Sequence, residues 1–406
     1  MPTRCLPTTD VRIGMFVVEL DRPWLGTPFA FQGFQVRSDV HLDAVRRYCK
    51  SVVIDEDLSV SEDEAEKHAL SAQRQALRGT TTYEIKRPVE EEFPVARQSY
   101  QAFEKVTEEL LQTFRRSGEV DADSLRESVA SMTASVQRNP NAALLLNMVQ
   151  DKQVAGDQRL IRRAIDTSVW MLTLGRFLQY GTARMEVLGL AGLLLDVGNV
   201  RMPRDLLNSH QALTPAQLQV VRRHVEASLD LIARAEGIPS AASEIVAQHH
   251  ERQDGSGYPS GLTAEAISID GAIAGLVDTF SAMTNVRPYA ASLSPSNALS
   301  AIYKLRNSLF HEALIEQFIQ CVGVYPVGSA VQLNTGEIGL VVAQNMVRRL
   351  QPRVMLMIDA QGRTLTAHKS LDLTKEPRTR DGAPYRIVKT VPVSNLPINP
   401  ADFFVA

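Results

Sequence analysis

The chain has 406 residues, of which 44% are hydrophobic and 22% are charged, and its formal net charge is −3. This length suggests about two to three domains, and the composition is ordinary for a folded protein with a sizeable core. The weakly acidic charge gives no global positive field, which argues against nucleic acid or an anionic membrane as a partner. No apolar run approaches the roughly 18–20 residues of a membrane span. The three cysteines show no metal-ligand spacing and indicate reduced thiols, so we expect a cytoplasmic protein.

Residues 1–60 are predicted to form a small β-rich domain. Residues 11–20 are apolar and rich in β-branched side chains, as strands are, and a segment dense in Gly, Pro and aromatic residues follows. We predict a short helix over residues 41–49 and a buried strand over residues 51–54. Residues 61–94 are polar and acidic, which predicts a mobile linker or an exposed helix.

Residues 95–150 are predicted to form a helical connector. Apolar side chains recur there at steps of three and four, which places them on one face of each helix. The two clearest runs are Tyr100, Phe103, Val106, Leu110 and Phe114, followed by Leu125, Val129, Met132 and Val136. Such faces either pack onto the next domain or form a homodimer interface, and the sequence leaves both alternatives open.

Residues 151–323 are strongly helical, whereas residues 324–406 change character. Two apolar runs joined by a Thr-Gly turn predict strands after residue 324, and the proline-rich end is expected to lie on the surface. The predicted fold class is therefore multidomain α+β. It combines a small β-rich N-terminal domain, an all-α helical bundle and a small β C-terminal appendage.

The helical region contains five candidate metal ligands. Imidazole and carboxylate groups are the donors that Fe, Mn, Zn and Ni accept. A lone histidine is more often structural, but here an adjacent pair ends an apolar helical run and meets a loop rich in Gly and Pro. The five candidates are Asp196, His224, His249, His250 and Asp278.

The segment HHERQDGSGYP at 249–259 resembles the signature of HD-GYP domains, HHE-x-x-DG-x-GYP. AGLLLDVGNVRMPRDLL at 191–207 and DTFSAMTNVRPY at 278–289 are similar to other segments of the family, as is the helix around His224. Both ends of the chain are also similar to modules of one HD-GYP subgroup. The resemblance implies an HD-type helical bundle in which iron or manganese ions activate water for hydrolysis of cyclic di-GMP.

Three positions depart from the family pattern. The histidine of the HD pair is replaced by Leu195, and the family lysine aligns with Asn199. The upstream ligand histidine aligns with Arg163, and arginine is always protonated and cannot bind a cation. The metal site that includes Asp278 thus loses two of its four ligands, while such sites need about three protein ligands. We therefore predict a degenerate, LD-GYP variant in which this site holds no metal.

The remaining candidates form a second set. Asp196, His224 and His249, with or without His250, would still hold one divalent transition metal, such as iron or manganese. The alternative is that these residues are hydrogen-bonded polar groups that bind none. We also predict that Arg163 lies within ion-pairing distance of Asp196 or Asp278, because an unpaired buried charge is costly. The alternative is that Arg163 points to solvent.

These losses favour a catalytically weak or silent protein of cyclic di-GMP signalling. It would act by binding cyclic di-GMP, with Arg287 pairing with a phosphate, or by binding a GGDEF-type or other signalling protein. Arg287 in a surface ion pair is the other interpretation. The candidate docking surface is the Gly-Tyr-Pro loop, with Asp254, Gly255, Gly257, Tyr258 and Pro259. The alternatives are an active metal-dependent phosphodiesterase with a reduced metal centre, and a scaffold that acts through dimerisation.

Overall fold

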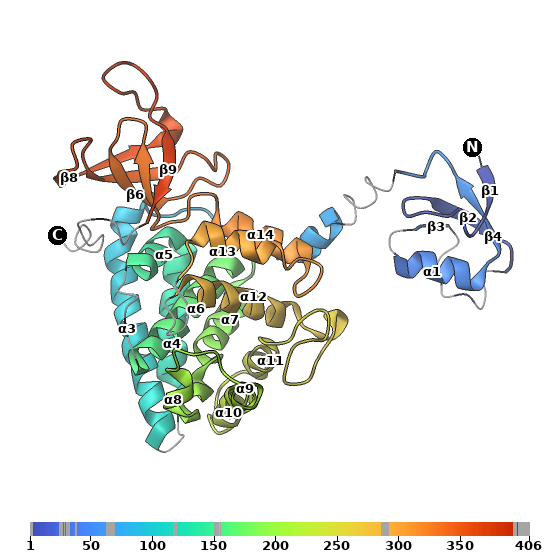
Figure 1. The fold of residues 1–406 in the computed structure, drawn as a ribbon, viewed down its shortest axis with the longest axis horizontal. Helices are drawn as coiled ribbons and strands as arrows, with labels where there is room; N and C mark the ends of the chain where they lie inside the picture. The colour runs from blue at the N-terminus through green and yellow to red at the C-terminus, as the bar shows by residue number, and fades with distance from the viewer. Residues whose placement is uncertain are drawn as a thin grey trace. The chain divides into compact units, whose positions relative to one another are not determined.

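The structure is a computed structural model, and it describes residues 3–23, 27, 29, 33–36, 39–61, 70–116, 120–149, 154, 156–285, 292–392 and 396. The chain divides into two units, Met1–Leu77 and Arg78–Ala406. Figure 1 shows the helices and strands of each. The fold class is multidomain α+β, as predicted.

The first unit is a small antiparallel sheet with one helix. Its helix is α1 (Asp39–Tyr48). The strand order across the sheet is β1 (Thr3–Pro7), β4 (Ser51–Asp55), β2 (Phe16–Leu20) and β3 (Phe34–Gln35). Val17, Val45 and Ile54 belong to one buried core between helix and sheet. The predicted helix and the predicted strand after it are confirmed, whereas β1 was not predicted.

The acidic segment expected to be a linker is in part helical and packed. Residues 70–76 are helical, and α3 (Val89–Arg116) begins inside the segment. The backbone of Gly79 donates a hydrogen bond of 2.8 Å to the carbonyl of Leu178. Most of residues 70–76 are exposed, which agrees with the alternative of an exposed helix, while residues 62–69 lie outside the described residues. The prediction is wrong from Val89 onward, where α3 begins and Glu92 is buried, because acidic composition does not show which carboxylates have a partner in the fold.

The second unit is a helical bundle around α6 (Asp157–Phe177), which contacts α3, α5, α7, α12 and α14 (Figure 1). The second half of α6 is buried because its residues are almost all apolar or small. No helix among the described residues is long and apolar enough to cross a membrane. The other helices are α4 (Ala122–Arg138), α5 (Pro140–Val149), α7 (Thr182–Leu194), α8 (Arg204–Leu207), α9 (Pro215–Arg222), α10 (His224–Ala233), α11 (Ser240–Gln248), α12 (Ile269–Thr284), α13 (Pro295–Tyr303) and α14 (Glu312–Val322), with 3₁₀ turns η1 (Val197–Arg201), η2 (Ala264–Ala266) and η3 (Leu373–Lys375).

The helical connector packs onto this bundle. α3 contacts α4, α5 and α6, and α4 also contacts α7. Phe103 and Leu110 on α3 are buried, as are Leu125 and Met132 on α4. Of the two alternatives for the apolar stripes, packing onto the neighbouring helices is therefore the one observed.

The C-terminal part is a five-stranded antiparallel sheet. Its strand order is β8 (Thr364–Asp372), β7 (Arg353–Ile358), β6 (Ile338–Ala343), β5 (Ala330–Leu333) and β9 (Ile387–Val391). The predicted Thr-Gly turn joins β5 to β6, and Gly336 takes a φ of 90° there, which favours glycine. The described part of the proline-rich end lies at the surface, as expected: β9 is an edge strand that pairs with β5, and its residues are exposed or half-buried.

Candidate metal centre and cavity

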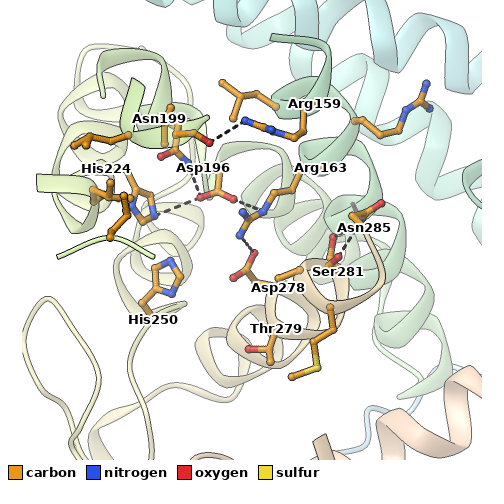
Figure 2. A pocket seen from close by; sticks show the side chains of 18 of the residues that line it. Arg159, Arg163, Asp196, Asn199, His224, His250, Asp278, Thr279, Ser281 and Asn285 are labelled. Carbon is orange, nitrogen blue, oxygen red and sulfur yellow. Dashed lines mark hydrogen bonds and ion pairs between the residues drawn. The ribbon is translucent and has the colours of Figure 1, made fainter. Parts of the chain in front are cut away.

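The candidate site is a cavity of about 450 Å³ beside α6 and α12, a size typical of small-molecule sites. Figure 2 shows the side chains that line it. The wall from α8 to α10 is partly apolar, with Leu206, Leu207, Leu213 and Val221. The rest of the wall is strongly charged. Among the described residues, its charged side chains are Arg159, Arg162, Arg163, Arg252, Asp196 and Asp278, and the rings of His224 and His250 stand among them.

Four short sequence segments bring the candidate ligands together. Asp196 follows α7, His224 begins α10, His249 follows α11, and Asp278 lies in α12. Gly198 is needed for this approach, because a Cβ atom there would lie 2.0 Å from the carbonyl oxygen of His224. The turn after α7 can therefore lie directly against the start of α10.

Two histidines have their ring orientation fixed by the backbone. His224 Nδ1 lies 2.8 Å from the Val221 carbonyl oxygen, and His249 Nδ1 lies 2.7 Å from that of Val246. A carbonyl oxygen only accepts, so Nδ1 carries the hydrogen in both rings. The Nε2 atoms of both rings are buried and make no hydrogen bond with any described residue. Metal-binding histidines commonly show this arrangement, in which the second nitrogen donates to a backbone carbonyl.

The donors converge on one point. Asp196, His224, His249 and His250 each offer an atom, and these atoms lie within 4.8 Å of one another. Burial lowers the pKa of His249 to about 4, so its imidazole is neutral at pH 7 and can offer a lone pair. Three imidazoles and one carboxylate are a donor set that divalent transition metals accept. The residues present therefore fit one metal ion, and Asp278 lies outside this group.

Arg163 lies between two buried carboxylates, as Figure 2 shows. Its Nε is 2.7 Å from Asp196 Oδ2, and its Nη2 is 2.7 Å from Asp278 Oδ1. The side chains of Asp196 and Asp278 are only 8% and 4% exposed. The predicted ion pair is thus confirmed, and it involves both carboxylates rather than one.

The two other departures from the family pattern lie beside Asp196. Asn199 is buried, and its amide donates a hydrogen bond of 2.9 Å to Asp196 Oδ1. Leu195 is buried, and its backbone carbonyl accepts a hydrogen bond of 3.1 Å from Ser228 Oγ. The side chain of Leu195 offers no donor atom to a metal, and the side chain of Asn199 offers no positive charge to a phosphate. Arg287, the predicted phosphate ligand, lies outside the described residues.

The Gly-Tyr-Pro loop is anchored at the site. Glu251 is buried, and its carboxylate accepts hydrogen bonds from the backbone of Ser260 and Leu262 at 2.7 and 2.9 Å. Gly257 allows close packing, because a Cβ atom there would lie 2.4 Å from the backbone nitrogen of Arg252. Asp254 caps the turn through Ser256, and Gly255 takes a φ of 77°. Tyr258 lines the cavity, whereas Pro259 is exposed.

Sequence reasoning missed Arg159 and the grouping of three arginines that line the cavity from α6. Arg159, Arg162 and Arg163 fall at positions i, i+3 and i+4, which places them on the same face of the helix. Arg159 donates to Asn208 Oδ1 at 2.8 Å, and Arg162 donates to the Tyr100 hydroxyl at 2.6 Å. This spacing was visible in the sequence, but only Arg163 stood out because it replaces a histidine.

Three family models match the chain. An HD domain matches residues 143–314, a domain of unknown function (DUF3391) matches residues 3–125, and a KOW domain associated with HD domains matches residues 330–379. These matches fall on the helical bundle, on the N-terminal part up to the start of α4, and on most of the C-terminal sheet. The HD and KOW matches agree with the predicted fold class, a helical bundle followed by a small β appendage.

Curated relatives support the same assignment. The chain is 29% identical over 378 residues to a cyclic di-GMP phosphodiesterase of Pseudomonas aeruginosa, which covers 92% of this chain and 90% of that protein. It is 31% identical over 145 residues to the cyclic di-GMP phosphodiesterase response regulator RpfG of Xanthomonas campestris, covering 35% of this chain and 38% of that protein. A 3'3'-cGAMP-specific phosphodiesterase of Vibrio cholerae is 34% identical over 115 residues, covering 28% of this chain and 26% of that protein. With the HHE-x-x-DG-x-GYP segment at the cavity, these matches show that the chain belongs to the HD-GYP family.

Proposed function

We propose that this HD-GYP protein binds a cyclic dinucleotide, cyclic di-GMP in the first place, and hydrolyses it weakly or not at all. One observation supports this most directly. The cavity is lined by four arginines among the described residues, whereas the donors on its wall suffice for one metal ion. Binding groups are therefore present, and hydrolytic groups are incomplete.

The charge of the cavity supports an anionic ligand. A cyclic dinucleotide carries two phosphodiester anions, and guanidinium groups bind phosphate oxygens through two parallel hydrogen bonds. Arg159 and Arg162 line the cavity while they donate to Asn208 and to Tyr100, and Arg163 pairs with both aspartates. The relatives named above are phosphodiesterases of cyclic di-GMP or 3'3'-cGAMP, which are ligands of this chemical class.

The proposed weakness of hydrolysis follows from what the chain supplies near the reacting phosphate. A metal bound by Asp196, His224 and His249 would supply Lewis acidity to the phosphodiester. Two-metal hydrolysis also needs a second ion that stabilises the leaving oxygen. Here Leu195 offers no ligand, and Asn199 donates its amide to Asp196 instead of presenting a charge to the ligand.

An active phosphodiesterase with a reduced metal centre is the second candidate. The observation in its favour is the convergence of four donors, two of which have buried Nε2 atoms without a hydrogen bond to any described residue. Such a centre would have one ion to activate water, and the charge of Arg163 would stand in the second position. Measured turnover separates this candidate from the first.

We also propose the Gly-Tyr-Pro loop as a docking surface for a GGDEF-type or other signalling protein. Asp254, Ser256 and Pro259 are exposed and available to a partner. Tyr258 is turned towards the cavity and lies against His250, so a docked protein would reach the metal centre only indirectly.

The test is calorimetric titration of the purified chain with cyclic di-GMP and with 3'3'-cGAMP, with and without Mn²⁺, together with chromatography of the nucleotide products. We expect saturable binding of one of them and hydrolysis at background. Arg159→Ala should weaken binding by about 10- to 100-fold, because it removes a charge-assisted hydrogen bond. The exposed Arg201, which does not line the cavity, provides the control Arg201→Ala. Turnover comparable to that of an intact family member at any metal loading would contradict the proposal.

A further inference from the structure

The two carboxylate oxygens of Asp196 face different neighbours. Its Oδ2 atom faces Arg163 Nε at 2.7 Å, whereas its Oδ1 atom lies 3.3 Å from His224 Nε2 and accepts the amide of Asn199. His224 therefore meets Oδ1 of this carboxylate. The other oxygen points to the guanidinium, on the side of Asp278 (Figure 2).

A second metal ion would have to occupy the place where the guanidinium lies. A metal bound to Asp196 Oδ2 would stand about 2.0–2.2 Å from that oxygen. Arg163 Nε is already 2.7 Å from the same oxygen, and Nη2 holds Asp278 Oδ1 at the same distance. Two cations at such a separation repel each other strongly in a poorly solvated site. The guanidinium and a second ion are thus mutually exclusive.

The guanidinium is also suited to replace the ion electrostatically. Two buried carboxylates without a cation are costly, and arginine remains protonated at every physiological pH. Its planar fork reaches both carboxylates at once, as the ion pairs of Arg163 show. The positive charge between Asp196 and Asp278 is therefore permanent and independent of the supply of metal.

We propose that Arg163 takes the place of one metal ion, so that the centre of this chain combines a single divalent transition metal with a covalently attached cation. Asp196, His224, His249 and His250 would hold the metal, and Arg163 neutralises Asp196 Oδ2 and Asp278. This deepens the proposed function, because it explains why a second ion is lost without loss of the fold. Its tests measure bound metal and thermal stability rather than nucleotide binding. A negative result would therefore contradict the role of Arg163 without contradicting the binding of a cyclic dinucleotide, and the reverse also holds.

The first test is metal stoichiometry with Mn²⁺ alone, measured by elemental analysis after dialysis. The wild-type chain is expected to hold about one equivalent. The variant Arg163→His with Leu195→His removes the guanidinium and supplies two imidazoles, so it should hold about two. Arg162→His changes the neighbouring arginine of the same helix and should remain at one. Two equivalents in the wild-type chain would overturn the proposal.

The second test is thermal unfolding with and without Mn²⁺, which does not depend on whether the double variant folds. Removal of metal by a chelator should lower the melting temperature of the wild-type chain by the contribution of its one ion, since an ion bound only to the folded state stabilises it. Arg163→Ala leaves two buried carboxylates without their cation, so it should melt lower and regain several degrees when Mn²⁺ is added. Arg162→Ala loses its bond to Tyr100 but should gain no more from Mn²⁺ than the wild type does. An Arg163→Ala chain that responds to Mn²⁺ no more than these controls would refute the exchange of guanidinium for metal.

Discussion

The phenol ring of Tyr258 lies flat on the imidazole ring of His250, with ring centroids 4.5 Å apart and an interplanar angle of 20°. The backbone nitrogen of Tyr258 also donates to the carbonyl of His250 at 3.2 Å. Arg222 lies over the same phenol ring, 4.8 Å from its centroid. The tyrosine of the Gly-Tyr-Pro loop therefore lies against a side chain of the candidate metal-binding cluster.

We expect Tyr258→Ala to weaken Mn²⁺ binding by about 2- to 10-fold, the contribution of one aromatic pair. Without the phenol ring, His250 can rotate away from the other donors. Tyr258→Phe keeps the stacked ring and should bind Mn²⁺ as the wild type does. Calorimetric titration measures both affinities. Equal affinities for the alanine and phenylalanine variants would show that the stack does not position His250.

Glu251 should hold the Gly-Tyr-Pro loop in place rather than take part in metal or nucleotide binding. Its buried carboxylate accepts the backbone hydrogens of Ser260 and Leu262. Glu251→Gln removes the charge and turns an amide donor towards a backbone donor, which should lower the free energy of unfolding by about 1.5–3 kcal/mol. Hydrogen exchange at the two amides should accelerate.

The control for this change is Glu265→Gln, at an exposed residue of η2 in the same region. Its stability and its exchange rates should stay at wild-type values. Slow exchange at residues 260 and 262 in the Glu251→Gln chain would mean that other contacts hold the loop.

Site residues that follow one another in the chain were the easiest to predict from the sequence. The pair His249–His250 and the loop after it form such a segment. The position of Arg163 could also be predicted. It replaces a ligand histidine of the family pattern, and a cation there can pair with the carboxylates of Asp196 and Asp278. The orientation of Tyr258 towards His250 could not be predicted, because the sequence of a loop does not show on which neighbouring side chain a ring will stack.

Long-range pairing explains most of what the sequence did not show. β1 pairs with β4 across some 45 residues of chain, and β9 joins β5 in a similar way, so neither pairing leaves a local pattern. The same holds for Glu92, whose partner Arg138 lies on another helix. Composition identified Glu92 as part of an acidic, solvent-exposed segment, whereas tertiary contact makes it a buried residue.

The pair of Glu92 and Arg138 should stabilise the attachment of α3 to α4. The Glu92 side chain is 0% exposed and receives two hydrogen bonds from Arg138, at 2.9 and 2.8 Å, and one from Ser135. Arg138→Met should lower the free energy of unfolding by about 3–5 kcal/mol, because it leaves a buried carboxylate without its cation. Urea unfolding measures the loss.

Arg363→Met is the matched control, since that arginine is 75% exposed and pairs with Asp359 at the surface. Arg363→Met should lower the free energy of unfolding by less than about 1 kcal/mol, as for other exposed pairs. An equal loss of unfolding free energy in Arg138→Met and Arg363→Met would show that burial does not strengthen the pair of Glu92 and Arg138.

Stability at alkaline pH should depend on Cys321, a buried thiol at the end of α14. Burial raises its pKa from the ordinary 9.0 to about 12, with Arg176 opposing the shift. A group whose pKa is raised in the folded state contributes stability that is fully present below its pKa in the unfolded chain. This stability is lost as the pH rises from that pKa towards the pKa of the folded chain. Between these values the unfolded chain loses the proton and the folded chain keeps it, so stability should fall by about 1.4 kcal/mol per pH unit.

Comparison of the wild type with Cys321→Ala isolates this contribution, because all other groups titrate in both chains. Above about pH 9, the free energy of unfolding should decrease less steeply in the alanine variant, so the two curves should converge between about pH 9 and pH 10. Cys5 is exposed, and Cys5→Ala should keep the wild-type slope. Parallel curves for the wild type and Cys321→Ala would mean that the thiol ionises equally in both states, and would place Cys321 in contact with water rather than in the core beside α6.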